Sequence, residues 1–165
     1  MSLDGFIATE DGGYDWIVDE PAIDFAAYLQ KIDTLLMGRG TYQIMDNPEA
    51  AQLLELKTTY VVSTTLDPNA DDRITVISED VVESVRALKE SEGGDIWLFG
   101  GGVLFRSMMD AGLVDRVEVA VVPALLGHGI PLLPGLGGIT KLALHSTETF
   151  PNSGIVLMKC DVLKD

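Results

Sequence analysis

Glycine clusters interrupt this sequence at two places where an apolar, strand-like run meets a helical pattern. Gly38-Arg39-Gly40-Thr41 follows the run that ends at Met37, and Gly100-Gly101-Gly102 follows the run that ends at Phe99. Such junctions point backbone N–H groups and the positive end of a helix at an anion beyond the sheet. Both junctions suit a dinucleotide, although the spacing is not the G-x-G-x-x-G fingerprint. The alternative for the second cluster is a tight turn with close helix-strand packing.

Arg39 adds a positive charge to the first junction. A guanidinium can hold a phosphate through paired N–H bonds where the backbone cannot supply full charge. Ser63 and Thr64 add hydroxyl groups at the end of the next expected strand, and the carboxyl ends of parallel strands share one edge of a sheet. These three side chains can therefore share one phosphate. The alternative for Arg39 is an ordinary surface ion pair with one of the many carboxylates nearby.

The elements that must position these residues alternate between strands and helices. Apolar and β-branched runs predict strands at 3–8, 34–37, 59–63, 74–77, 95–99, 116–122, 142–150 and 155–163. Helical spacing predicts helices over 22–32 after Pro21, after a Thr41 cap, after a Ser78 cap and from Gly102 to Met109. This order predicts an α/β protein of one domain, 1–165, with a mainly parallel sheet and an added C-terminal antiparallel hairpin.

Composition and charge exclude several classes of protein. The net charge is -15 with 11 basic residues, so no basic stripe can neutralise a nucleic-acid backbone. The acidic residues indicate either a solvated surface or adaptation to a salt-rich cytoplasm. No apolar run is long enough to span a membrane and no leader pattern is present, so we expect a cytoplasmic protein. Cys160 is expected to be a small buried thiol, and no metal site is expected.

Several segments together resemble known reductases. Three are similar, in this order, to the NADPH-binding segments of dihydrofolate reductase: Leu36-Met37-Gly38-Arg39-Gly40-Thr41-Tyr42, Val61-Val62-Ser63-Thr64 and Leu98-Phe99-Gly100-Gly101-Gly102-Val103-Leu104. Others are closer to the reductase domain of bacterial riboflavin biosynthesis: Ser2-Leu3-Asp4-Gly5-Phe6-Ile7-Ala8, and Ala111-Gly112-Leu113-Val114-Asp115 with Pro123-Ala124-Leu125-Leu126-Gly127. The resemblance covers nearly the whole chain. It implies a three-layer α/β/α fold of the dihydrofolate reductase type, with NADPH as cofactor.

The same resemblance implies roles for individual residues. Arg39 and Ser63 would hold the 2'-phosphate that distinguishes NADPH from NADH, with Thr64 helping. Thr41 and the segment Gly100 to Leu104 would line the pyrophosphate and the nicotinamide ribose. The full cofactor-binding set that we predict is Gly38, Arg39, Thr41, Ser63, Thr64, Phe99, Gly100, Gly101, Gly102, Val103 and Leu104.

The substrate side matches the family less well. The riboflavin-pathway reductase holds its substrate phosphate with two arginines, and neither is present: Leu29 falls near the first position, and the segment 46–49 supplies no cation. Asp24 falls near the acid that assists pterin protonation in dihydrofolate reductase, although an exposed helical carboxylate is the alternative. Tyr14 and Trp16 are candidates for stacking on a flat substrate ring, whereas packing of the loop against the core would explain Trp16 equally well.

The remaining titratable candidates are two histidines. His128 lies in a Gly-His-Gly loop and is either a solvated residue or a general acid, and His145 is expected to face outward from an alternating strand.

We therefore predict an NADPH-dependent reductase of a small substrate, resembling 5-amino-6-(5-phosphoribosylamino)uracil reductase. Dihydrofolate reduction is the alternative on the same fold, and NADPH sensing without turnover is the alternative of another class. A homodimer is expected, because the riboflavin-pathway reductases form dimers through this domain and the valines of 117–122 indicate a strand buried on both faces. Burial inside one subunit is the alternative explanation of the valine pattern. Relatives carry several apolar residues before the Ser2-Leu3-Asp4-Gly5 segment, so a short first strand is also expected.

Overall fold

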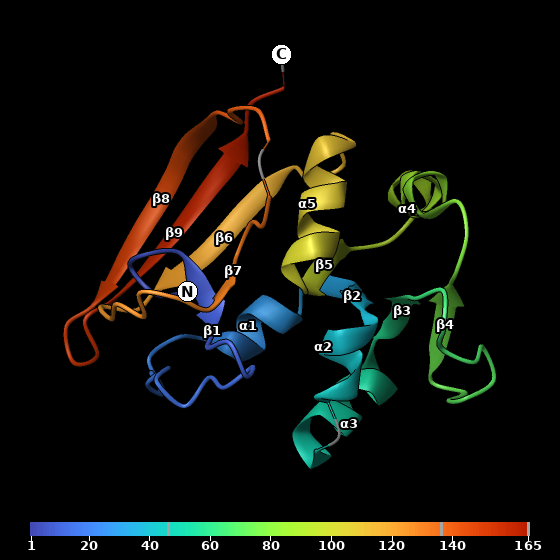
Figure 1. Ribbon diagram of the computed structural model, residues 1–165, viewed down its shortest axis with the longest axis horizontal. Coiled ribbons are helices and arrows are strands. Elements are labelled where there is room, and N and C mark those ends of the chain that lie inside the picture. The colour runs from blue at the N-terminus through green and yellow to red at the C-terminus, as the bar shows by residue number, and fades with distance from the viewer. Residues whose placement is uncertain (46, 136, 165) are drawn as a thin grey trace. The chain divides into compact units, whose positions relative to one another are not determined.

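The computed structural model describes residues 1–45, 47–135 and 137–164 (Figure 1). Its helices and strands alternate through much of the chain, as the sequence predicts for an α/β protein. They divide into two compact units, formed by residues 24–105 and by residues 1–23 with 106–165. The prediction of a single domain stays a prediction, and each unit is described by itself.

The unit of residues 24–105 is built on a four-stranded parallel sheet with the order β4-β3-β2-β5. Its strands are β2 (Ile32–Gly38), β3 (Thr58–Val62), β4 (Ile74–Ile77) and β5 (Asp95–Gly100). Its helices are α1 (Phe25–Leu29), α2 (Arg39–Gln43), α3 (Pro48–Leu56), α4 (Val81–Glu90) and the start of α5 (Gly102–Asp110). The central strand β2 is the most deeply buried, with Leu35 and Met37 at 0% exposure, as expected for a parallel strand covered on both faces.

The other unit contains the predicted C-terminal hairpin. Strand β8 (Leu142–Phe150) pairs antiparallel with β9 (Ile155–Val162), and β9 pairs with β6 (Arg116–Val121) in a three-stranded sheet of order β6-β9-β8 (Figure 1). A second, two-stranded sheet joins β1 (Phe6–Ala8) to β7 (Ile130–Pro131). Gly154, with φ +74, permits the tight turn of the hairpin. The predicted hairpin is thus confirmed.

Two predicted features of this unit need correction. The first strand begins at Phe6 rather than Leu3, because residues 2–5 form a turn in which the Gly5 N–H donates to the Ser2 carbonyl at 3.1 Å. Strand β6 is half-buried along residues 117–121 rather than buried on both faces, since it lies at one end of its three-stranded sheet. Next to it, the Met1 amino group donates to the Ala120 carbonyl at 2.6 Å.

Three helices also start at other residues than the sequence predicts, each for a local reason. The first helix begins after Asp24 rather than at Pro21, because the Asp24 carboxylate accepts a hydrogen bond from the Ala27 N–H at 2.8 Å. Thr41 lies inside α2 and does not cap it, since that helix starts directly after the extended Gly38. Helix α4 starts after Asp80, whose φ of 48 lies in the left-handed region, rather than after Ser78.

Among the described residues, no helix is both long enough and apolar enough to cross a membrane.

Candidate functional site

The glycine-rich junctions meet at one edge of the parallel sheet. In the register of the strands, Gly38 at the end of β2 lies opposite Val62 of β3, and Met37 lies opposite Gly100 of β5. The chain leaves β2 toward β3 and β4 and later returns to the other side of β2 as β5, so the strand order reverses between β2 and β5. Ligands of open α/β sheets bind at this kind of reversal, beyond the carboxyl ends of the strands.

The glycines at this edge differ in the space around them. A Cβ atom placed on Gly100 would lie 2.9 Å from the Thr41 Oγ1 atom, so the two junctions touch and no side chain fits between them. A Cβ atom on Gly38 or Gly40 would meet no atom of residues 1–45, 47–135 or 137–164 within 4 Å, so among these residues the backbone of the first junction borders open space. The site therefore combines a tight contact at Thr41 with an uncovered backbone at Gly38 and Gly40. A nucleotide that lies against exposed peptide groups needs this arrangement, and the residues present fit it.

Arg39 and the end of β3 form the charged part of this edge. Arg39 is exposed, and its Nη1 donates a hydrogen bond to the Thr65 hydroxyl. Ser63 is 8% exposed, and its Oγ accepts the N–H groups of Thr65 at 3.2 Å and Leu66 at 3.0 Å. The Ser63 hydroxyl thus shapes the turn and keeps its O–H as a donor. Thr64 is exposed beside it.

Thr65 contacts Arg39, although the sequence patterns did not predict it as a site residue. Its hydroxyl, rather than that of Thr64, is the one that Arg39 contacts. The run of three hydroxyl residues Ser63-Thr64-Thr65 was the available signal. It could not be resolved further, because the turn after β3 decides which hydroxyl faces α2.

The second junction begins a helix of nine residues. The Gly100–Gly101 peptide bond is cis, and the Phe105 N–H donates to the Gly101 carbonyl at 3.0 Å. Val103 is 75% exposed, whereas Leu104 and Gly102 are buried. The first turn of α5 therefore has one side in solvent and one in the protein interior. The positive end of the α5 dipole lies at this turn, which favours an anion there.

Phe99 takes part in packing as well as in the site. Its ring contacts the Trp97 ring edge-to-face with centroids 4.6 Å apart, and Trp97 contacts Tyr28 at 5.1 Å and Phe25 at 5.7 Å. Phe25 remains half exposed. Aromatic pairs of this geometry add to the stability of the β5–α1 packing.

Asp24, the candidate catalytic residue, caps a helix. It is exposed, and its carboxylate caps α1 through the Ala27 N–H. Near the expected substrate-phosphate positions, Leu29 ends α1, and Asn47 caps α3 by accepting from the Ala50 N–H at 2.9 Å. Asp46 of the same segment lies outside the described residues.

The aromatic and histidine candidates belong to the other unit. Tyr14 is exposed. Trp16 packs against the cluster of Val122, Phe150 and Ile155, and its buried Nε1 has no hydrogen-bond partner among the described residues. His128 is exposed in its loop.

The predicted buried thiol and outward-facing histidine are both observed. His145 faces outward as predicted, with Nδ1 3.6 Å from the Asp161 Oδ2. Cys160 is buried, as predicted. The described residues contain no cluster of three potential metal ligands.

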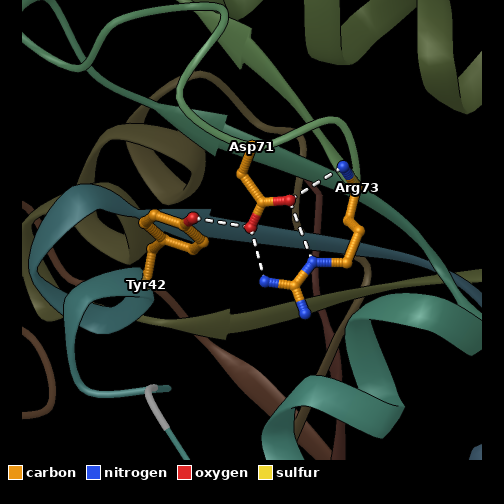
Figure 2. A network of polar contacts seen from close by, with 3 residues as sticks. All are labelled: Tyr42, Asp71 and Arg73. Atoms are coloured by element: carbon orange, nitrogen blue, oxygen red, sulfur yellow. Dashed lines mark hydrogen bonds and ion pairs between the residues drawn. The ribbon is translucent and has the colours of Figure 1, made fainter.

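A polar network joins α2 to the connection between β3 and β4. The Tyr42 hydroxyl donates to Asp71 at 2.9 Å, and the Arg73 guanidinium contacts both oxygens of the same carboxylate (Figure 2). Hydrogen bonds from Arg73 hold the pKa of Asp71 well below its ordinary value, and the same contacts raise the pKa of Arg73. Sequence patterns do not indicate this network, because Asp71 belongs to an acidic loop that has the composition of a solvated surface.

Strand order, register and the glycine-rich edge define an α/β protein with the dihydrofolate reductase-like fold. The chain belongs to the RibD C-terminal domain family, whose model matches residues 1–156. The family and fold predicted from the sequence are thereby confirmed. The family indicates that the protein is an oxidoreductase, which was also predicted.

Among related sequences, the uncharacterized proteins YwjB and YyaP of Bacillus subtilis are 35% and 33% identical to this chain. The matches cover 91% and 94% of this chain and 88% of each relative. The riboflavin biosynthesis protein RibD of Corynebacterium ammoniagenes is 28% identical over 81% of this chain, which matches 44% of that protein.

Solved structures agree in fold. A putative riboflavin biosynthesis protein from Shewanella superposes with a TM-score of 0.80 at 25% identity, covering 99% of this chain and 95% of that one. Dihydrofolate reductase from Enterococcus faecalis, solved with NADP(H), superposes with a TM-score of 0.67 at 18% identity, covering 99% and 92%.

Proposed function

We propose that this protein is an NADPH-dependent reductase that binds the nucleotide along the carboxyl edge of the β4-β3-β2-β5 sheet. The observation that carries the proposal is the meeting of the two glycine junctions at Thr41 and Gly100, with Arg39 and three hydroxyl residues beside the first junction. The family membership and the NADP(H)-bound structural neighbour support the same cofactor.

Each part of the edge has a role in this proposal. Arg39 and the Ser63–Thr65 turn bind the 2'-phosphate, because the guanidinium and the hydroxyl groups offer donors to a doubly charged group. The N–H groups at the start of α5 bind the pyrophosphate. Gly38 and Gly40 leave room for the nucleotide to lie against the backbone.

The chemistry asks little of the protein's side chains. When bound, the dihydronicotinamide supplies the hydride, and the protein aligns the substrate and excludes water. The structure gives Asp24 a capping contact, so we assign it no proton transfer. The substrate that we propose is a small heterocycle or sugar imine, as in the pyrimidine reductases of the family.

The test is NADPH consumption with a panel of acceptors: a pterin, a ribosylaminopyrimidine with and without its phosphate, and a quinone. We expect turnover with the aminopyrimidine class and little with the pterin. Because arginines are missing at the two expected phosphate positions, we expect the substrate phosphate to add little to the rate. Tight NADPH binding without turnover of any acceptor would contradict the proposal that the protein is an enzyme and would favour a protein that senses NADPH.

A further inference from the structure

Helix α2 carries Arg39 but is too short to fix its own position. It has five residues, and its N-cap Gly38 has no side chain to bond the first N–H groups. Helices of this length are unstable in water by themselves, so contacts with the rest of the unit decide where α2 lies. The direction in which Arg39 points therefore depends on what holds the helix.

One face of α2 is tied to the connection between β3 and β4 at two points. Arg39 and Tyr42 are three residues apart, which places them on the same face of the helix. Arg39 donates to the Thr65 hydroxyl, and the Tyr42 hydroxyl donates to the Asp71 Oδ2 at 2.9 Å (Figure 2). Both acceptors lie in the connection, residues 63–73.

Asp71 is itself held rigidly. Its carboxylate accepts the Arg73 Nε at 2.9 Å, the Arg73 Nη2 at 2.7 Å and the Arg73 backbone N–H at 2.9 Å. The Asp71 side chain is only 11% exposed. Paired, charge-assisted hydrogen bonds of this kind are stronger and more directional than neutral ones. Tyr42 thus bonds to an acceptor that cannot easily turn away.

We propose that Tyr42, Asp71 and Arg73 are positioning residues for recognition of the cofactor's 2'-phosphate. They hold α2 so that Arg39 points at the Ser63–Thr65 turn before the nucleotide arrives, which lowers the ordering cost of binding. The inference rests on the proposed function. A contact that acts only through Arg39 changes the affinity for NADPH and leaves the affinity for NADH, which lacks this phosphate, nearly unchanged.

The first test is Tyr42→Phe, which removes only the hydroxyl. The lost bond has a charged acceptor, but it acts on the cofactor only through Arg39, so its effect on binding should be smaller than that of a direct contact. We expect NADPH to bind about two- to tenfold more weakly and NADH to change less than about twofold. Asp71→Asn should act in the same direction, and it carries the test if Tyr42→Phe does not fold. The matched control is Tyr60→Phe on β3, because the Tyr60 hydroxyl makes no hydrogen bond to the described residues. Equal losses for both cofactors in Tyr42→Phe would overturn the inference.

The second test asks whether Tyr42 acts through Arg39. In an Arg39→Ala background, Tyr42→Phe should no longer weaken NADPH, because the group that it positions is gone. An undiminished loss in that background would overturn the inference.

Amide hydrogen exchange of α2 in the cofactor-free protein provides a separate readout. Tyr42→Phe should speed this exchange if the hydroxyl tethers the helix, and unchanged exchange would contradict the tether. If the unmodified protein binds NADPH and NADH equally, the proposed cofactor preference and the positioning role both fail. Faster exchange in the same samples would still identify the tether, so the two failures are distinguishable.

Discussion

Replacement of Arg39 by Ala tests the assignment of the 2'-phosphate site. Arg39 is exposed, and within the described part of the chain its guanidinium makes one hydrogen bond, to the Thr65 hydroxyl, which leaves most of its donors for a ligand. A charge-assisted hydrogen bond contributes about 1.5 to 3 kcal/mol, and exposure to water and salt favours the lower end. About 1.5 kcal/mol corresponds to roughly a tenfold change in Kd. We therefore expect Arg39→Ala to weaken NADPH about tenfold and NADH by less than about twofold.

The assay is calorimetric titration of each variant with NADPH and with NADH. Arg86→Ala is the control: Arg86 lies on the exposed side of α4, 3.5 Å from Glu83, and its loss removes the same charge from the chain. Raising the salt concentration should reduce the NADPH preference of the unmodified protein, since ions screen an exposed guanidinium–phosphate pair. The assignment is refuted if Arg39→Ala weakens both cofactors equally, or if Arg86→Ala reproduces its effect.

Four further predictions concern the packing, capping, charge and assembly of the protein. Gly100→Ala should lower the melting temperature and weaken NADPH, because the new methyl group would meet the Thr41 side chain at 2.9 Å; unchanged melting and binding would contradict the close contact. Asp24→Ala should lower the free energy of unfolding in denaturant by about 1 kcal/mol, the typical value of a helix cap. Asp24→Asn should keep most of the stability of the cap, and neither substitution should change the hydride-transfer rate. Because the folded pKa of Asp71 is depressed, the stability that its ion pair contributes should be complete above pH 3.8 and decline as the pH falls further; melting curves of Arg73→Ala should lack this acid-dependent part. We propose a homodimer, and sedimentation of a 17.8 kDa particle at micromolar concentration would reject it.

The sheet and its glycine-rich edge were predictable because they follow from short-range patterns. The apolar run from Thr34 to Met37 indicated a strand, and it lies inside the parallel sheet between β3 and β5. The turn at Gly154 between two alternating runs indicated the hairpin. Patterns of this kind depend only on residues close together in the sequence, so the structure retains the elements that they predict.

The helix starts were harder to predict because more than one residue can begin the same helix. The polar network was harder to predict because its partners are far apart in the sequence. Pro21 permits a helix start, but the Asp24 carboxylate caps the helix three residues later, and the sequence alone does not rank the two starts. The bond between Tyr42 and Asp71 joins residues 29 positions apart, within a loop whose charges also suit solvent. Contacts of that kind follow only from the register of β2, β3 and β4.

Backbone amide shifts measured by nuclear magnetic resonance during an NADPH titration test the central claim most directly. We predict that the largest shifts fall on residues 38–41, 63–65 and 100–104, and that NADH reproduces those at 100–104 but not those at 63–65. Saturable NADPH binding that leaves these three segments unshifted, or the absence of NADPH binding, would contradict the account.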